Sequence, residues 1–251
     1  DWIRLLPYGV LYSCTKQAYW HIVNRGYDRP LSEQIGEFAE RYNPMREGIN
    51  GTIRTDFHGY INPGNPRLAA ELAHREGTIN CTKNGLYGMC FAAACISAAL
   101  SRNPSLDTIM AAGLSVVPRR SRLYEAIRWT MDLYAEGKGW EYVNNRIFER
   151  WHYINWAGVI INIPICVLAL LEGKLDYTRT ISVATMAGVD TDCNAATVGS
   201  IVGAACGFDA LPEKFTAPLN DRVESCVANF GSGTISELVG RTVALRQRLD
   251  A

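Results

Sequence analysis

The chain of 251 residues carries 25 Lys and Arg against 25 Asp and Glu, so its formal net charge is zero. A neutral chain without a basic stripe argues against a nucleic-acid partner. Hydrophobic residues make up 48% of the chain, which is enough to bury a substantial core within one large domain.

The eight cysteines are scattered and form neither a C-x-x-C pair nor a His-rich zinc spacing. This usage favours a reduced, cytoplasmic protein. The longest apolar stretches, 89–100 and 160–171, are too short to span a bilayer, and the chain shows no signal-peptide pattern. We therefore expect no membrane association.

Helical periodicity dominates the chain. The expected helices span residues 2–24, 32–41, 66–76, 86–100, 106–112, 121–135, 140–149, 154–171, 177–187, 193–206 and 235–249. Pro7 and Pro164 fall inside two of them, where proline strains or kinks a helix. Pro, Gly and Asn clusters separate the helices, and no strand pattern of convincing length appears.

The sequence therefore predicts an all-α fold, a compact single-domain helical bundle over residues 1–251. The chain starts at Asp1 without an initiator Met and already in helical pattern. This start indicates a domain that is incomplete at its N-terminus.

The most informative segment is 188–194, Gly-Val-Asp-Thr-Asp-Cys-Asn, which opens into an apolar helix. The carboxylates of Asp190 and Asp192 could converge on a hard cation such as Mg²⁺ or Ca²⁺. The alternative is ordinary helix capping, which needs only one acceptor. An EF-hand is excluded, because Ala195 stands where that loop requires Gly and Ile201 where it requires Glu.

The helix that follows is rich in Ala and Gly and apolar on all faces, so we expect it in the centre of the molecule. Carboxylates at the start of a buried helix are costly unless a cation or strong donors accompany them. This cost favours the cation over a simple cap.

Three other segments are candidates for a site. Residues 48–56 hold Gly48, Gly51 and Arg54, which could cradle a phosphate, although these residues alone favour a plain turn with a solvated Arg. Residues 151–156 combine aromatic and polar groups that pack in a core or stack on a sugar or base. The pattern of residues 78–85 is typical of a capped loop that precedes an Ala-rich helix.

In this order the segments resemble the ADP-ribosylglycohydrolase family. Segment 188–194 is similar to the family's Gly-Gly-Asp-Thr-Asp-Thr-Asn metal motif, and 48–54 to its Gly-x-x-Gly-x-Met-Arg segment. The resemblance extends from about Gly48 to Gly207. It implies an all-helical fold of ADP-ribosylglycohydrolase type over residues 1–251.

The resemblance also implies a Mg²⁺-dependent hydrolase that cleaves a glycosidic bond at C1 of an ADP-ribosyl or related ribosyl group. The family holds two Mg²⁺ ions, and fewer are compatible with this chain. Asp190 and Asp192 would be the metal ligands and catalytic carboxylates. The residues expected at the substrate are Gly48, Asn50, Gly51, Asn155 and Asn194.

The chain departs from the family pattern at several points. Nothing before Gly48 matches the family's early Asp-Asp-Thr motif. Either a missing N-terminal segment or a partner chain supplies it, or the chain is a divergent member with altered activity. Cys193 replaces a Thr, and Cys81 stands where a His is usual. Asp56 is a candidate replacement carboxylate.

Two other functions stay open. The chain could be a non-catalytic relative that binds a nucleotide-sugar or has a structural role. It could also be a metal-independent carbohydrate-processing enzyme, for which the sequence offers no second carboxylate pair.

Overall fold

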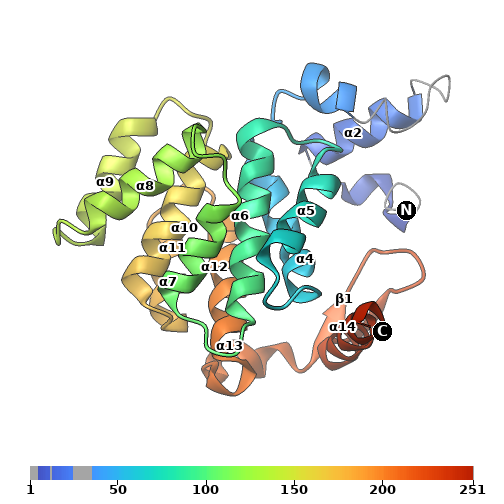
Figure 1. The fold of residues 1–251 in the computed structure, drawn as a ribbon. Helices are drawn as coiled ribbons and strands as arrows, with labels where there is room; N and C mark the ends of the chain where they lie inside the picture. The colour runs from blue at the N-terminus through green and yellow to red at the C-terminus, as the bar shows by residue number, and fades with distance from the viewer. Residues whose placement is uncertain (1–4, 12, 25–35, 251) are drawn as a thin grey trace. The chain divides into compact units, whose positions relative to one another are not determined.

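The structure is a computed structural model that describes residues 5–11, 13–24 and 36–250. In these residues the fold is predominantly helical, as Figure 1 shows, so the all-α prediction is confirmed. The chain divides into two compact units. One unit comprises Glu47–Gly77 and Thr82–Leu211; the other comprises Asp1–Arg46, Thr78–Cys81 and Pro212–Ala251. The predicted single domain over residues 1–251 stays a prediction.

The first of these units holds every candidate segment except 78–81. Its helices are α4 (Asp56–Tyr60), α5 (Pro66–Gly77), α6 (Lys83–Ala99), α7 (Leu106–Ser115), α8 (Arg122–Tyr134), α9 (Trp140–Trp151), α10 (Val159–Gly173), α11 (Tyr177–Met186) and α12 (Thr191–Cys206), with the short 3₁₀ helices η3 (Ile49–Arg54) and η4 (Phe208–Ala210).

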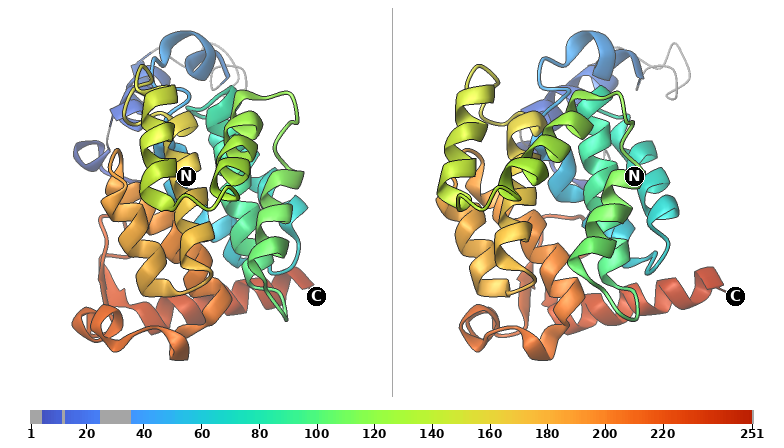
Figure 2. Two further views of the ribbon diagram at one scale, coloured as in Figure 1. Left: turned by 90° about the vertical axis from the view of Figure 1, so that its left-hand side faces the viewer. Right: turned by 60° about the vertical axis from the view of Figure 1, so that its left-hand side comes forward.

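Helices α6 and α10 form the core of this unit because both are apolar on every face and almost entirely buried. Helix α6 packs against α4, α5, α7 and α12, while α10 packs against α8, α9, α11 and α12. Figure 2 shows the same central helices from two further sides. Pro164 lies inside α10, which continues to Gly173.

Close helix packing in this core depends on glycine at position 88 of α6. A Cβ there would lie 2.5 Å from Val159 Cγ2 and 3.1 Å from Thr52 Oγ1. Only glycine lets α6 approach the start of α10 and the η3 segment this closely. The packing brings the candidate segment 48–56 and the start of α10 against one helix.

Several helices of this unit begin with a side-chain cap. The side chains of Ser105 and Ser121 accept from the amides three residues on, at 3.1 Å each, and Asp176 accepts from the Arg179 amide at 2.6 Å. These contacts satisfy amides that a helix leaves without partners at its N-terminus.

The second unit contains α2 (Ser13–Asn24), the 3₁₀ turn η1 (Tyr8–Val10), the π-helix η2 (Phe38–Tyr42), α13 (Glu213–Thr216), η5 (Ala217–Leu219) and α14 (Ile235–Asp250). Its strands β1 (Arg222–Glu224) and β2 (Ser232–Thr234) form an antiparallel pair. Asn80 links parts of this unit, since its amide donates to Thr15 Oγ1 at 3.3 Å and its carbonyl accepts from the Asn43 side chain.

Several predicted boundaries are wrong. The single helix expected over 2–24 is interrupted at Pro7, which is extended, and α2 begins only at Ser13. The helix expected over 154–171 begins at Val159, because residues 154–158 form a loop. The helix expected over 32–41 continues as a π-helix to Tyr42, and its residues 32–35 lie outside the described chain.

The sequence prediction also missed short elements. Helix α4 and the two strands of three residues each were not expected. Such short elements carry too few residues to establish a periodic pattern. Within the described residues, no helix is both long and apolar enough to cross a membrane.

Candidate metal and substrate site

The Asp-x-Asp loop turns sharply into α12. Gly188 and Val189 both have positive φ, at 85° and 64°, so the chain reverses just before the two aspartates. Glycine adopts this conformation at no steric cost, whereas Val189 adopts it against its preference. Asp190 takes the N-cap position of α12, yet its side chain makes no capping hydrogen bond. The Cys193 amide, three residues on, is close enough to lower the pKa of this carboxyl, so capping contributes to its role without a hydrogen bond of normal geometry.

Asp190, Asp192 and Cys193 form one cluster of potential ligands. One ligand atom from each lies within 4.8 Å of the others. Asp190 is only 6% exposed and Cys193 is also buried, whereas Asp192 is exposed. The cluster thus has a buried base and a side open to solvent.

Burial raises the pKa of the Asp190 carboxyl, and the nearby Asp192 raises it further, while the Cys193 thiol and amide act in the opposite direction. Burial together with both aspartates raises the pKa of the Cys193 thiol. The thiol therefore stays protonated. A bound cation would relieve the unfavourable proximity of the two carboxylates.

One buried asparagine of α10 holds this loop. Asn162 Oδ1 accepts from the Asp190 amide at 3.2 Å and from Asn194 Nδ2 at 2.9 Å. Its Nδ2 donates to the carbonyls of Trp156 at 2.7 Å and Gly158 at 2.9 Å. The sequence analysis did not identify Asn162. A polar residue in the apolar run 159–171 was the available signal, because such a residue needs partners.

The predicted glycine segment lies against the loop 154–158. The Ile49 amide donates to the Ala157 carbonyl at 2.7 Å, the Val159 amide donates to the Glu47 carbonyl at 3.0 Å, and Gly48 and Gly158 form an antiparallel bridge. Through Asn162 this loop connects to the aspartates. Three of the four segments singled out in the sequence therefore adjoin one another.

The predicted substrate residues occupy different environments. Gly48 and Gly51 are buried, and Asn50 is half-buried at the start of η3. Asn155 is exposed, and its Oδ1 accepts from the Ala157 amide at 2.9 Å, which shapes the loop. Trp156 of the same loop and Tyr153, which directly precedes the loop, are 58% and 67% exposed.

Asn194 is fully buried, and both ends of its amide are engaged. Besides its bond to Asn162, its Oδ1 lies 3.5 Å from Cys166 Sγ. The structure gives Asn194 a supporting position beneath the aspartates. Its predicted contact with substrate stays a prediction.

Two other expectations change. Arg54, considered as a phosphate ligand, is ion-paired with Glu76, its Nε lying 2.8 Å from Oε1 and 3.0 Å from Oε2. Asp56, considered as a replacement ligand, does not join the cluster but accepts a hydrogen bond from Ser200, two turns further along α12 than Asp192. Cys81 belongs to the other unit.

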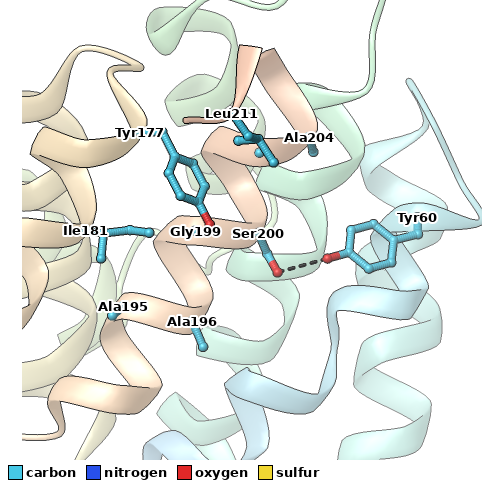
Figure 3. A pocket seen from close by; sticks show the side chains of 10 residues that line it. Tyr60, Tyr177, Ile181, Ala195, Ala196, Gly199, Ser200, Ala204 and Leu211 are labelled. Carbon is cyan, nitrogen blue, oxygen red and sulfur yellow. Dashed lines mark hydrogen bonds between the residues drawn. The ribbon is translucent and has the colours of Figure 1, made fainter. Parts of the chain in front are cut away.

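A groove follows the small-residue face of α12 (Figure 3). It has a volume of about 570 Å³, and Tyr60 and Tyr177 stand on either side of Ser200 and Gly199 in the close-up. Ala195 and Ala196, three and four residues after Asp192, share its helix face and begin the groove. The groove therefore starts one turn from the exposed carboxylate.

The side chains present fit a hard divalent cation. The buried carboxylate of Asp190 and the exposed carboxylate of Asp192 lie close together, and Mg²⁺ commonly takes one or two carboxylates and completes its shell with water and substrate oxygens. Cys193 adds no suitable ligand for such a cation, since its sulfur is a soft donor. Asp190 and Asp192 would thus be the ligands that the protein supplies to such a cation.

The chain was compared with known proteins. A sequence model described as ADP-ribosylglycohydrolase matches residues 9–249, nearly the whole chain. A search of curated proteins finds no match. The family match agrees with the helical fold and with the motif around Asp190 and Asp192. The chain belongs to the ADP-ribosylglycohydrolase family.

Proposed function

We propose that the protein is a Mg²⁺-dependent hydrolase that cleaves the glycosidic bond at C1 of an ADP-ribosyl or related ribosyl group. The observation that carries the proposal is the pair of carboxylates, Asp190 and Asp192, gathered at the start of α12 with one side open to solvent. Family membership supports the reaction class.

In the proposed reaction the bond from C1 to the leaving atom breaks, and water supplies the new oxygen on C1. Its proton goes to the leaving group. Positive charge develops at C1 in the oxocarbenium-like transition state, and the negative charges of Asp190 and Asp192 stabilise it. The metal, when bound, would orient ribose hydroxyls and lower the pKa of a bound water.

The loop 154–158 would bind the rest of the substrate. The exposed rings of Tyr153 and Trp156 offer flat faces for a base, and the exposed Asn155 amide offers donors to ribose or phosphate oxygens. Gly48, Asn50 and Gly51 lie on the segment paired with this loop and would line the same side. Asn194 would contact the substrate only if the loop opens.

The test is release of ADP-ribose from an ADP-ribosylated peptide, measured with Mg²⁺ and with EDTA. We expect turnover that requires Mg²⁺ and that falls at least about 100-fold in Asp190→Asn and in Asp192→Asn. Unchanged turnover in both variants would contradict the proposal, and turnover insensitive to EDTA would point to the metal-independent alternative.

Asp176→Asn is the matched control. Asp176 also stands at a helix N-cap, but its carboxylate accepts from the Arg179 amide and lies outside the cluster. Because Asn caps a helix about as well as Asp, this variant should keep both its helix stability and its turnover. Equal losses of turnover in Asp176→Asn and Asp190→Asn would mean that removing a carboxylate at any helix start lowers turnover, and metal binding would not explain the effect.

The second candidate is a non-catalytic relative that binds a nucleotide-sugar. The observation that favours it is Cys193, whose protonated thiol replaces an oxygen ligand of the family motif. It predicts saturable binding of ADP-ribose without hydrolysis of any ADP-ribosylated peptide. A Cys193→Thr variant that gains turnover would support the interpretation that the wild-type chain is non-catalytic.

A further inference from the structure

We propose that Asn162 is a positioning residue, which fixes the metal-binding loop and the loop 154–158 relative to each other. The inference rests on the proposed function and adds a residue on which its geometry depends. Asn162 lies on α10, outside both loops, and is fully buried.

The amide of Asn162 uses its entire hydrogen-bonding capacity. Its oxygen accepts two bonds, both from the segment 190–194, and its nitrogen donates two, both to the loop 154–158. A side-chain amide offers two acceptor sites and two donors, so none is left over. Turning the amide over would set its NH₂ against two donors and its oxygen against two carbonyls. One orientation is therefore strongly preferred.

This arrangement makes the position of one loop depend on the other. The bond to the Asp190 amide fixes the backbone from which that carboxylate projects, and the bond to Asn194 fixes the first turn of α12. The donor side fixes the carbonyls of Trp156 and Gly158, next to the bridge between Gly158 and Gly48. Groups that orient metal ligands without touching the metal typically change metal affinity 10–100-fold when removed.

Two substitutions separate the two sides of the amide. Asn162→Leu removes all four bonds. Asn162→Asp has nearly the same shape and keeps oxygen acceptors for Asp190 and Asn194, but its ionised form cannot donate to the two carbonyls. Asn62→Leu serves as the control for a lost buried asparagine, because Asn62 is 2% exposed and donates to the His58 carbonyl.

Hydrogen exchange of individual amides gives a readout that needs no metal. In Asn162→Leu we expect about tenfold faster exchange at Asp190, Ile49 and Val159, the effect of losing a buried hydrogen bond. In Asn162→Asp the Asp190 amide should stay protected, while Ile49 and Val159 exchange faster. Asn62→Leu should leave all three amides unchanged. Equal acceleration at Asp190 in Asn162→Leu and Asn62→Leu would overturn the proposal.

Mn²⁺ titration followed by electron paramagnetic resonance tests whether Asn162 also affects the proposed metal site. Wild type should bind Mn²⁺, and Asp190→Asn should not. Asn162→Leu should bind about 10–100-fold more weakly, and Asn162→Asp should recover most of that loss. Unchanged Mn²⁺ affinity in Asn162→Leu overturns the positioning role alone. Unchanged affinity in Asp190→Asn overturns the proposed metal site, and hydrogen exchange still decides the role of Asn162.

Discussion

Helix α12 borders two carboxyl groups with raised pKa values, and the two differ in their neighbours. Burial is the main cause in both cases. Asp190 lies beside a second acid, Asp192. Asp56 of α4 instead accepts a hydrogen bond from Ser200, whose own oxygen accepts from the Tyr60 hydroxyl at 2.9 Å.

The comparison shows that burial alone does not mark a cation site. A lone buried carboxyl can become neutral by taking up a proton, and the pKa of Asp56 is raised to about 6. Two adjacent carboxyls gain more from a shared cation, because it removes their repulsion as well as compensating their burial. The neighbouring side chains therefore decide whether a carboxyl beside α12 takes up a proton or favours a shared cation.

The largest expected effect is stabilisation by Mg²⁺. At a concentration about 100 times the dissociation constant, a bound ion adds about 2.7 kcal/mol to the free energy of unfolding. Wild type and Asp56→Asn should both gain this amount in thermal unfolding, and Asp190→Asn should gain none. A loss of the Mg²⁺ effect in Asp56→Asn would mean that both carboxyls serve one site, and the comparison would fail.

The next effect is the pH dependence of stability that Asp56 creates. Its pKa is about 6 in the folded protein against an ordinary 3.8, so the folded state binds the proton more tightly. Stability should therefore fall as pH rises from about 4 to about 6, by about 2 kcal/mol, because solvent around the half-buried side chain weakens the effect. Denaturant unfolding of wild type minus Asp56→Asn isolates this slope, because other groups contribute equally to both. A difference that does not vary with pH would contradict the assignment.

A smaller effect distinguishes two helix starts. Asp176→Ala should cost about 1 kcal/mol, because Asp176 caps α11 through the Arg179 amide. Asp190→Ala, measured in EDTA, should cost less, since its side chain makes no capping bond and its burial beside Asp192 is unfavourable. Urea unfolding of both variants measures the difference. Equal losses in the free energy of unfolding would mean that Asp190 acts as a simple helix cap.

The smallest effect concerns the hydroxyl at the edge of the groove. Tyr60→Phe removes the hydrogen bond to Ser200 and keeps the ring, so we expect a loss of about 0.5 kcal/mol in urea unfolding. Mg²⁺ should stabilise this variant as it does wild type. A larger loss would mean that the Tyr60 hydroxyl supports the buried Asp56 more strongly than its exposed position suggests.

The long helices were predictable because their patterns extend over many residues. Helices α6, α8, α9, α11 and α12 lie where apolar periodicity places them, and α10 differs mainly at its start. Pro7 was recognised as a source of strain, but periodicity alone could not show that the chain becomes extended there. The short helix α4 offers one turn of sequence, too little for a periodic signal.

The candidate site was predictable only in part. The sequence identified the aspartate loop, the glycine segment and the aromatic loop by their residue types and by their resemblance to the family pattern. It did not reveal Asn162, since nothing in the sequence shows which carbonyls and amides a buried side chain will meet. It also left Arg54 and Asp56 open, and their partners Glu76 and Ser200 become neighbours only through tertiary packing.

The bridge between Gly48 and Gly158 also bears on how the protein folds. The two segments that it joins are separated in the sequence by helices α4 to α9, and Asp190 and Asp192 follow only after α10 and α11. Closing such long loops is entropically unfavourable until the intervening helices have packed. The candidate site therefore forms late in folding, and partly folded chains, however helical, lack it.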